Sequence, residues 1–179
     1  MINMVRTKEK EAGALFAKDF GMKNVMAHPR LTKVVISVGT GSKMDKKKKE
    51  LVLERITLIA GQKAITRPAK KSIATYKTRE GDPIGVMVTL RGAQMYAFLD
   101  RLIHISLPRM RDFKGISPKS IDRKGNLTIG ITESTIFPET AEDDLRDSFG
   151  FAVTLVSTAK DAKIAHIFFK HIGIPFRAV

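Results

Sequence analysis

Two-residue alternation of apolar and polar residues predicts several β-strands along the chain. In residues 31–39, LTKVVISVG, the side chains of Val34, Ile36 and Val38 fall on one face of an extended strand. Ser37 falls on the other face. We therefore expect a strand here with its aliphatic face in the core. NLTIGIT and FAVTLVST alternate in the same way and predict two further strands in the C-terminal third of the chain.

Apolar residues at three- and four-residue spacing predict helices between these strands. The predicted helices cover residues 8–20, about 45–60, about 92–104 and about 161–171. Three of them are followed by a glycine, which commonly ends a helix, at Gly21, Gly61 and Gly173.

The stretch SIATYKTREGDPIGVMVTLRG, residues 72–92, reads as two strands joined by a loop around Gly81, Asp82 and Pro83. The segment 105–111 is also strand-like. Because hairpins and helices are mixed along the chain, we expect an α+β fold with a mostly antiparallel sheet. No internal repeat or Pro/Gly/Ser-rich linker is present, which predicts a single domain over residues 1–179.

Composition points to a polyanionic partner. Lysine and arginine number 32 against 18 acidic residues, which gives a formal net charge of +14. Nucleic acid is the favoured partner, ahead of an anionic membrane surface. The chain has no cysteine, so it can form neither a disulfide nor a thiolate metal site, and we expect it in the cytoplasm. No apolar run of about 18 residues marks it for a membrane.

The segment VGTGSK, residues 38–43, follows a predicted strand and precedes a predicted helix, where phosphate-binding loops occur. It lacks the third glycine of a dinucleotide-binding motif and the closing Gly-Lys-Ser/Thr of a Walker loop. We favour a tight turn here. A nucleotide-dependent enzyme that uses this loop is the alternative hypothesis.

Other candidates for catalysis are weak. The acidic stretch FPETAEDDLRD is better explained as a helix start, with Thr140 and Asp143 in a capping arrangement, than as paired catalytic carboxylates. His166 and His171 are five residues apart, which places them on different faces of a helix and misses the spacing of a zinc pair. We expect no enzyme activity, no cofactor and no metal.

Basic residues gather in clusters separated by apolar segments. The clusters are Lys46, Lys47, Lys48 and Lys49; Lys70 and Lys71; Lys77 and Arg79; Arg91; and Arg109, Arg111 and Lys114. The first cluster begins a helix, where the helix dipole disfavours cations. It indicates either an external phosphate or a solvated charge run that Asp45 makes tolerable by capping the helix. Together the clusters favour a nucleic-acid-binding scaffold.

Several longer stretches resemble one known family. They are LIAGQKAITRPAKKSIA (58–74), KTREGDPIGVMVTLRG (77–92), RLIHISLPRMRDFKGIS (101–117), GNLTIGITESTIFPE (125–139) and GIPF (173–176). The chain resembles bacterial large-subunit ribosomal protein L5 over nearly its whole length. The resemblance implies a curved, mostly antiparallel sheet with helices packed on one side. It also implies a structural role that holds 5S rRNA in the central protuberance of the ribosome.

The resemblance further implies residue roles. The family's 5S rRNA contacts match Ser37, Gln62, Thr89 and Arg91 of this chain, where largely uncharged groups read 2′-hydroxyls and splayed bases. Family members usually carry asparagine at the position of Ser37 and lysine at that of Pro68, so this chain departs from the pattern at both.

The family's hairpin loop, here about 74–85, reaches toward P-site tRNA, with Lys77, Arg79 and Gly81 as its candidate contacts. The resemblance also implies that the segment from Arg109 onward, with Arg111 and Lys114, faces a small-subunit head protein across an inter-subunit bridge, and that 23S rRNA is a further partner. The resemblance thus implies a monomer within the cytoplasmic ribosome. A free basic RNA chaperone is the remaining alternative.

Overall fold

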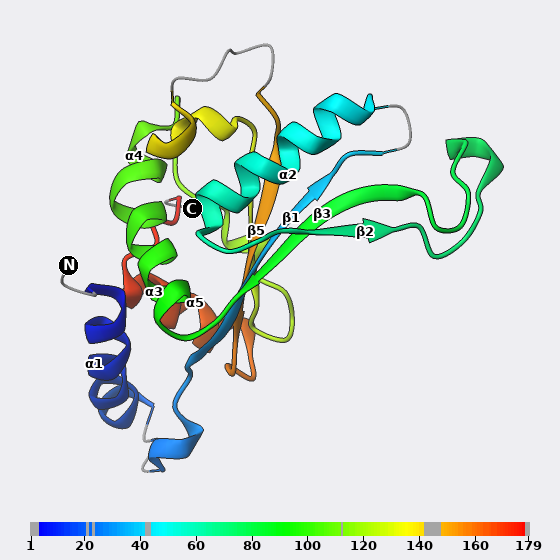
Figure 1. Cartoon of the computed structure of the whole chain (residues 1–179). Helices are drawn as coiled ribbons and strands as arrows, with labels where there is room; N and C mark the ends of the chain where they lie inside the picture. The colour runs from blue at the N-terminus through cyan, green and yellow to red at the C-terminus, as the bar shows by residue number, and fades with distance from the viewer. Residues whose placement is uncertain are drawn as a thin grey trace. The chain divides into compact units, whose positions relative to one another are not determined.

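Five strands form one sheet in the computed structural model, which describes residues 4–20, 22, 24–41, 44–111, 113–141 and 148–177. The strands are β1 (Leu31–Gly39), β2 (Ile65–Pro68), β3 (Pro83–Leu90), β4 (Leu127–Ile131) and β5 (Phe151–Ser157), in the spatial order β2-β3-β1-β5-β4. Figure 1 labels β1, β2, β3 and β5. The α-helices are α1 (Met4–Asp19), α2 (Lys46–Ala60), α3 (Gly92–Arg101), α4 (Leu107–Arg109) and α5 (Ala162–Ile172). A π-helical segment, Leu102–Ser106, joins α3 to α4.

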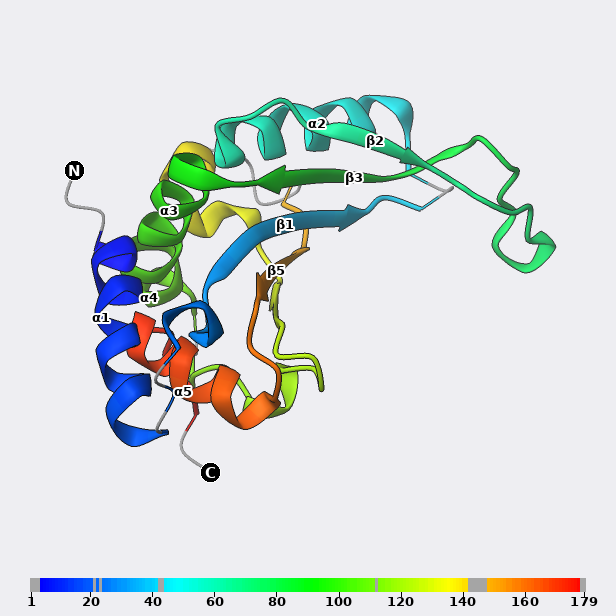
Figure 2. The ribbon, with the colours of Figure 1, turned by 90° about the horizontal axis from the view of Figure 1, so that it is seen from below.

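Strands β2 and β3 pair in antiparallel orientation. Ile65 of β2 lies opposite Met87 of β3, and Arg67 lies opposite Gly85. Figure 2 shows β3 and β1 side by side and running in opposite directions. These strands and the helices that pack on them confirm the predicted α+β class.

The chain divides into two compact units. The first consists of residues 1–34, 91–129 and 154–179, and the second of residues 35–90 and 130–153. Strands β1, β4 and β5 each begin in one unit and end in the other. A single domain over the whole chain stays a prediction.

In the second unit, α2 packs on β3. Val52 and Ile56 of the helix are buried, as are Val86 and Val88 of the strand. The burial of alternate residues in β3, and of residues four apart in α2, gives each element one face in the core. Gly61 ends α2 in the left-handed conformation, with a φ of 67° and its N–H bonded to the Thr57 carbonyl at 2.9 Å.

In the first unit, α1 packs against α3 and α5. Phe16 of α1 and Phe168 of α5 are buried with their ring centroids 6.4 Å apart. Glu9 of α1 accepts two hydrogen bonds, one from the Leu31 backbone N–H at 2.8 Å and one from the Tyr96 hydroxyl. Burial raises the pKa of the Tyr96 hydroxyl to about 12, and the bond to Glu9 acts in the same direction. This carboxylate therefore ties α1 to both β1 and α3.

Two predicted segments are wrong. The strand-like segment 105–111 is helical through Arg109, because the burial of Ser106 and Leu107 continues the helical spacing of Leu102 and Ile103. The first strand of the hairpin is β2 at Ile65–Pro68 instead of the segment after residue 72.

Residues Ala74–Tyr76 form a 3-10 turn inside a long loop, and there Ile73 and Thr78 make only an isolated bridge. Asp45 stands at the N-cap position of α2 but makes no capping hydrogen bond through its side chain. The Asp45 side chain therefore does not cap the helix and so does not offset the unfavourable interaction of Lys46–Lys49 with the helix dipole.

Gly115 provides a test of the packing in the first unit. Its φ is +89°, and a Cβ placed there lies 2.7 Å from the Arg177 nitrogen, because Ile116 pairs with Phe176 in a parallel bridge. We expect Gly115→Ala to lower the free energy of unfolding by about 2–4 kcal/mol, from left-handed strain together with the steric conflict. Urea unfolding measures this.

Gly81→Ala is the matched control. Gly81 has the same φ of +89°, but nothing lies within 4 Å of the position that its methyl group would take. It should therefore lose only about 1–2 kcal/mol for the strained backbone. Equal losses for the two variants would show that the contact with the C-terminal segment does not constrain Gly115.

Thr140 provides a second test. Its buried hydroxyl donates to the Ser134 carbonyl at 2.7 Å, whereas the helix start that it was predicted to cap, residues 142–147, lies outside the described residues. We expect Thr140→Ala to cost about 0.5–1.5 kcal/mol of unfolding free energy, because the Ser134 carbonyl loses one of two donors and keeps the Phe137 N–H at 3.2 Å. Thr140→Ser keeps the hydroxyl and should recover most of that loss in the same urea measurement. An alanine variant as stable as the parent would contradict this assignment.

Candidate nucleic-acid interface

The face of β1 and β3 that points away from the core carries both polar and apolar side chains. Ser37 of β1 and Thr89 of β3 are half-buried, and each stands between buried neighbours of its own strand. Because alternate residues point to opposite faces, both side chains lie on the outer face of two adjacent strands. The structure thus places two of the four predicted 5S rRNA residues on one surface, which we call the open sheet face.

Gln62 lies near the end of the open sheet face at which Thr89 stands. It is exposed and follows Gly61, the residue that ends α2. Because Ile65 pairs with Met87, the residues just before β2 approach those just after Met87, where Thr89 stands. The Ala64 N–H bonds to the Thr57 hydroxyl at 3.1 Å, which fixes the turn between Gln62 and the strand.

Arg91 extends the surface along the chain. It is exposed, and only Leu90 separates it from Thr89. Its backbone is extended, with φ −140° and ψ 162°, at the N-cap position of α3. Arg91 is the residue at which the chain passes from the second unit into the first, two positions after Thr89.

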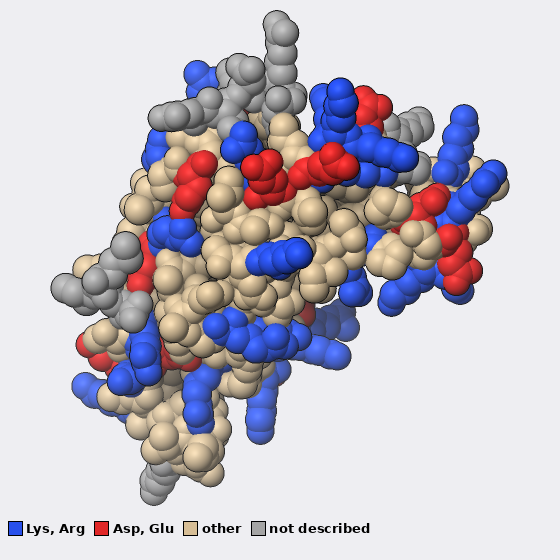
Figure 3. Space-filling model, in the orientation of Figure 1, with Lys and Arg blue, Asp and Glu red and all other residues tan. Residues whose placement is uncertain are grey.

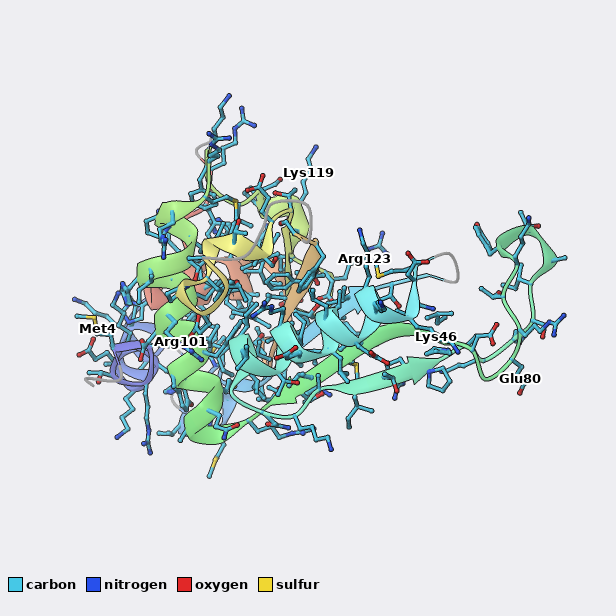
Figure 4. All side chains as sticks on the ribbon, turned by 45° about the horizontal axis from the view of Figure 1, so that its top comes forward. Met4, Lys46, Glu80, Arg101, Lys119 and Arg123 are labelled. Atoms are coloured by element: carbon cyan, nitrogen blue, oxygen red, sulfur yellow. The ribbon has the colours of Figure 1, made fainter. Side chains whose placement is uncertain are left out.

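A long loop connects β2 to β3 and extends beyond the ends of both strands (Figure 1). Figure 4 places Glu80 on this loop. The predicted contact residues Lys70, Lys71, Lys77, Arg79 and Gly81 all lie on it and are exposed. The described segments contain one non-glycine residue with a positive φ, Lys77 at +52°, and it follows the Ala74–Tyr76 turn.

Hydrogen bonds order the loop despite its exposure. Ile73 and Thr78 exchange backbone hydrogen bonds of 3.1 and 3.2 Å. The Ala69 N–H donates to the Asp82 carbonyl at 2.8 Å, and the Asp82 carboxylate accepts from the Arg79 N–H at 2.8 Å. The loop therefore has a defined backbone in the free chain, which lowers the entropy lost on binding.

The lysines of α2 lie near the base of this loop. Lys46, Lys47 and Lys48 are exposed, and the Lys49 ammonium donates to the Pro83 carbonyl at 3.0 Å. Figure 4 shows Lys46 at the end of α2 that faces the hairpin. The first lysine cluster and the hairpin lysines thus contribute to one basic region of the second unit.

Arg109, Arg111 and Lys114 form a separate basic group in the first unit. All three are exposed, Phe113 among them is half-buried, and Asp112 lies outside the described residues. The chain is held shortly afterwards, where the Ile116 N–H donates to the Pro175 carbonyl at 2.9 Å. These cations lie on a short segment that runs from Arg109, the last residue of α4, to the backbone pairing of Ile116.

The described residues of the turn after β1, Thr40 and Gly41, are not arranged as a phosphate loop. The described amides of Thr40 and Gly41 both donate to the Ile84 carbonyl at 3.0 Å, so neither is presented to a ligand. In the described residues no group of three or more His, Asp or Glu side chains could hold a metal ion. No helix in the described part of the chain is long and apolar enough to span a membrane.

Sequence reasoning missed one feature of this region, a cleft beneath the hairpin loop with Ile73 and Tyr76 in its wall. The only signal was the aromatic and aliphatic residues within the basic stretch KKSIATYKTR. Figure 3 shows that basic side chains are more widespread than acidic ones on the displayed face.

Comparisons with known proteins agree with this picture of a basic, RNA-facing scaffold. Residues 24–79 match the family model described as ribosomal protein L5, and residues 83–176 match the model of the C-terminus of the same ribosomal family. Large ribosomal subunit protein uL5 of Geobacter sulfurreducens is 46% identical over 178 residues, covering 97% of this chain and 99% of that protein. The protein of the same name from Heliobacterium modesticaldum is 48% identical over 179 residues, covering 98% and 99%.

These matches define a class first, the structural proteins of the large ribosomal subunit. Within that class, the chain belongs to the uL5 family of ribosomal proteins. The resemblance noted in the sequence is confirmed. The chain is therefore an RNA-binding, non-enzymatic constituent of the large subunit, which acts in translation on the cytoplasmic ribosome. This excludes the nucleotide-dependent enzyme.

Proposed function

We propose that the open sheet face binds 5S rRNA through Ser37, Gln62, Thr89 and Arg91. The observation that supports this proposal is the convergence of Gln62 and Thr89 at one end of the β2–β3 pair, with Arg91 two residues further along the chain. Hydroxyl and amide groups in this arrangement suit RNA, because its 2′-hydroxyls and unstacked base edges both donate and accept hydrogen bonds.

The chemistry divides between the uncharged residues and the arginine. Ser37 and Thr89 each offer a hydroxyl on a strand whose other face is fixed in the core, so their positions are set before RNA arrives. Gln62 adds an amide with two donors and an acceptor. Arg91 supplies the charge that pairs with phosphate. Ser37 has a shorter side chain than the family's asparagine, so it offers a hydroxyl where an amide would reach further.

The hairpin loop serves a second contact in this proposal. Lys77, Arg79 and Gly81 meet the backbone of P-site tRNA, and their exposure on a hydrogen-bonded loop supports that role. The lysines at 46–49, 70 and 71 add sequence-independent contacts to rRNA phosphates, including those of 23S rRNA.

The basic segment of the first unit has a third partner. Arg109, Arg111 and Lys114 contact a small-subunit head protein or adjacent rRNA across an inter-subunit bridge, and their common exposure at and after the end of α4 supports this. The chain acts as a monomer within the ribosome in this proposal.

Alanine substitutions separate recognition from charge. Thr89→Ala and Gln62→Ala should each weaken 5S rRNA binding by about one to two decades, because an RNA group is left unpaired, and should barely change the salt dependence. Arg91→Ala should weaken binding and also lower the slope of log K against log salt by about 0.9, because one phosphate contact is lost. Filter binding from low to moderate salt measures both effects.

Thr66→Ala is the control for this series. Thr66 lies on β2 opposite Val86, whose side chain is buried on the core face, so Thr66 is exposed on the side away from the open sheet face. It should bind 5S rRNA like the parent. The proposal fails if Thr89→Ala and Gln62→Ala also bind like the parent while substitution of the lysines at 46–49 abolishes binding.

The hairpin is tested by the double variant Lys77→Ala with Arg79→Ala. It should leave 5S rRNA binding nearly unchanged and weaken P-site tRNA binding to ribosomes that carry the variant, because the loop extends beyond the strands of the open sheet face. Lys119→Ala with Arg123→Ala removes two charges from the first unit and is the control. A loss of about tenfold or more in 5S rRNA affinity would assign the loop to the 5S site instead.

A further inference from the structure

A cleft of about 1010 Å³ lies beneath the hairpin loop of the second unit. One wall is Gly39 at the end of β1 with Thr40 and Gly41 after it, together with Ile84 of β3. The other wall is the end of β2 and the loop as far as Thr78. A Cβ built at either of these glycines meets nothing within 4 Å, so space for a ligand extends to the backbone of this wall.

The lining combines cations with apolar and aromatic surface. Arg67, Lys70 and Lys71 line the cleft, and none of the described residues in its walls is acidic. Tyr76 and Ile73 line it as well, with 68% and 45% of their surfaces exposed. Exposed aromatic and aliphatic side chains contribute little to the stability of a loop, so this composition points to a ligand with a flat apolar part and a negative charge.

Both walls are ordered before any ligand binds. The Ile73–Thr78 bridge and the Ala69–Asp82 hydrogen bond close the loop on one side. The bonds from Thr40 and Gly41 to the Ile84 carbonyl fix the other side. The cleft is therefore a preformed feature of the hairpin.

We propose that this cleft takes one unpaired nucleotide of RNA. Its base packs against Tyr76 and Ile73, and its flanking phosphates pair with Arg67, Lys70 and Lys71. A stacked aromatic ring beside a basic track is the arrangement that holds single-stranded nucleic acid, and a base inside a duplex cannot enter a cleft of this kind. The inference rests on the proposed function of the hairpin as an RNA contact and adds a base-binding site to it.

The test is a titration of the full chain with a single-stranded RNA hexamer, in which isoleucine methyl NMR signals report the binding. Ile73 and Ile84 line the cleft, so their methyl signals should shift on binding. Tyr76→Ala should weaken hexamer binding by about tenfold, because base stacking is lost, and Tyr76→Phe should bind within about twofold of the parent. Val25→Ala, at a residue 69% exposed in the first unit, removes a similarly exposed apolar side chain and should have no effect.

A hexamer that lacks one base separates base binding from phosphate binding. If the cleft holds a base, the hexamer should lose affinity when that base is removed. Equal affinity for the intact and abasic hexamers, or parental binding by Tyr76→Ala, would overturn the proposal.

Parallel titrations with 5S rRNA and with tRNA identify the source of the nucleotide. The RNA whose binding weakens in Tyr76→Ala supplies it, and a weakened hexamer alone indicates another rRNA segment. The Thr89 and Gln62 variants test 5S rRNA binding by the open sheet face, whereas Tyr76→Ala tests base binding in the cleft. Either proposal can therefore be contradicted while the other stands.

Discussion

Burial of alternate residues of β1 and β3 is the constraint on which this structure and its proposed function both depend. Val86 and Val88 are buried on the face against which α2 packs, and Ile36 and Val38 are buried in the neighbouring strand. Because the period of a strand is two, this burial fixes Ser37 and Thr89 on the opposite face. A shift of one residue in either strand would bury the hydroxyls and expose the aliphatic groups, so recognition and folding are set by the same register.

Helices and strands were predicted correctly where the sequence carries the periodicity of only one of them. The strand at 31–39 and the helix that ends at Gly61 were correct because alternation in one and a left-handed glycine in the other leave few alternatives. The segment 105–111 was wrong because Ile103, Ile105 and Leu107 also alternate, and only packing shows that Ser106 is buried while Ile105 is exposed. β2 gave little signal because all four of its residues are exposed.

The candidate site was predictable in part. Alternation alone assigns Thr89 and Ser37 to the strand face opposite the buried aliphatic residues. Gly61, as a helix-ending glycine, places Gln62 just after α2. Their assignment to 5S rRNA came from family resemblance and not from their chemistry. The cleft beneath the hairpin was beyond sequence reasoning, because Gly41 and Tyr76 are far apart in the chain and meet only through the pairing of three strands.

The central claim is that 5S rRNA is recognised by the open sheet face and not by the exposed surface of α2 around Leu58. Methyl NMR of the full chain, free and bound to 5S rRNA, tests this most directly. The methyl groups of Thr89 and Met87, on the outer face of β3, should shift on binding. The methyl groups of Leu58, exposed on α2, should keep their free positions. A shifted Leu58 with unchanged Thr89 and Met87 would contradict the account.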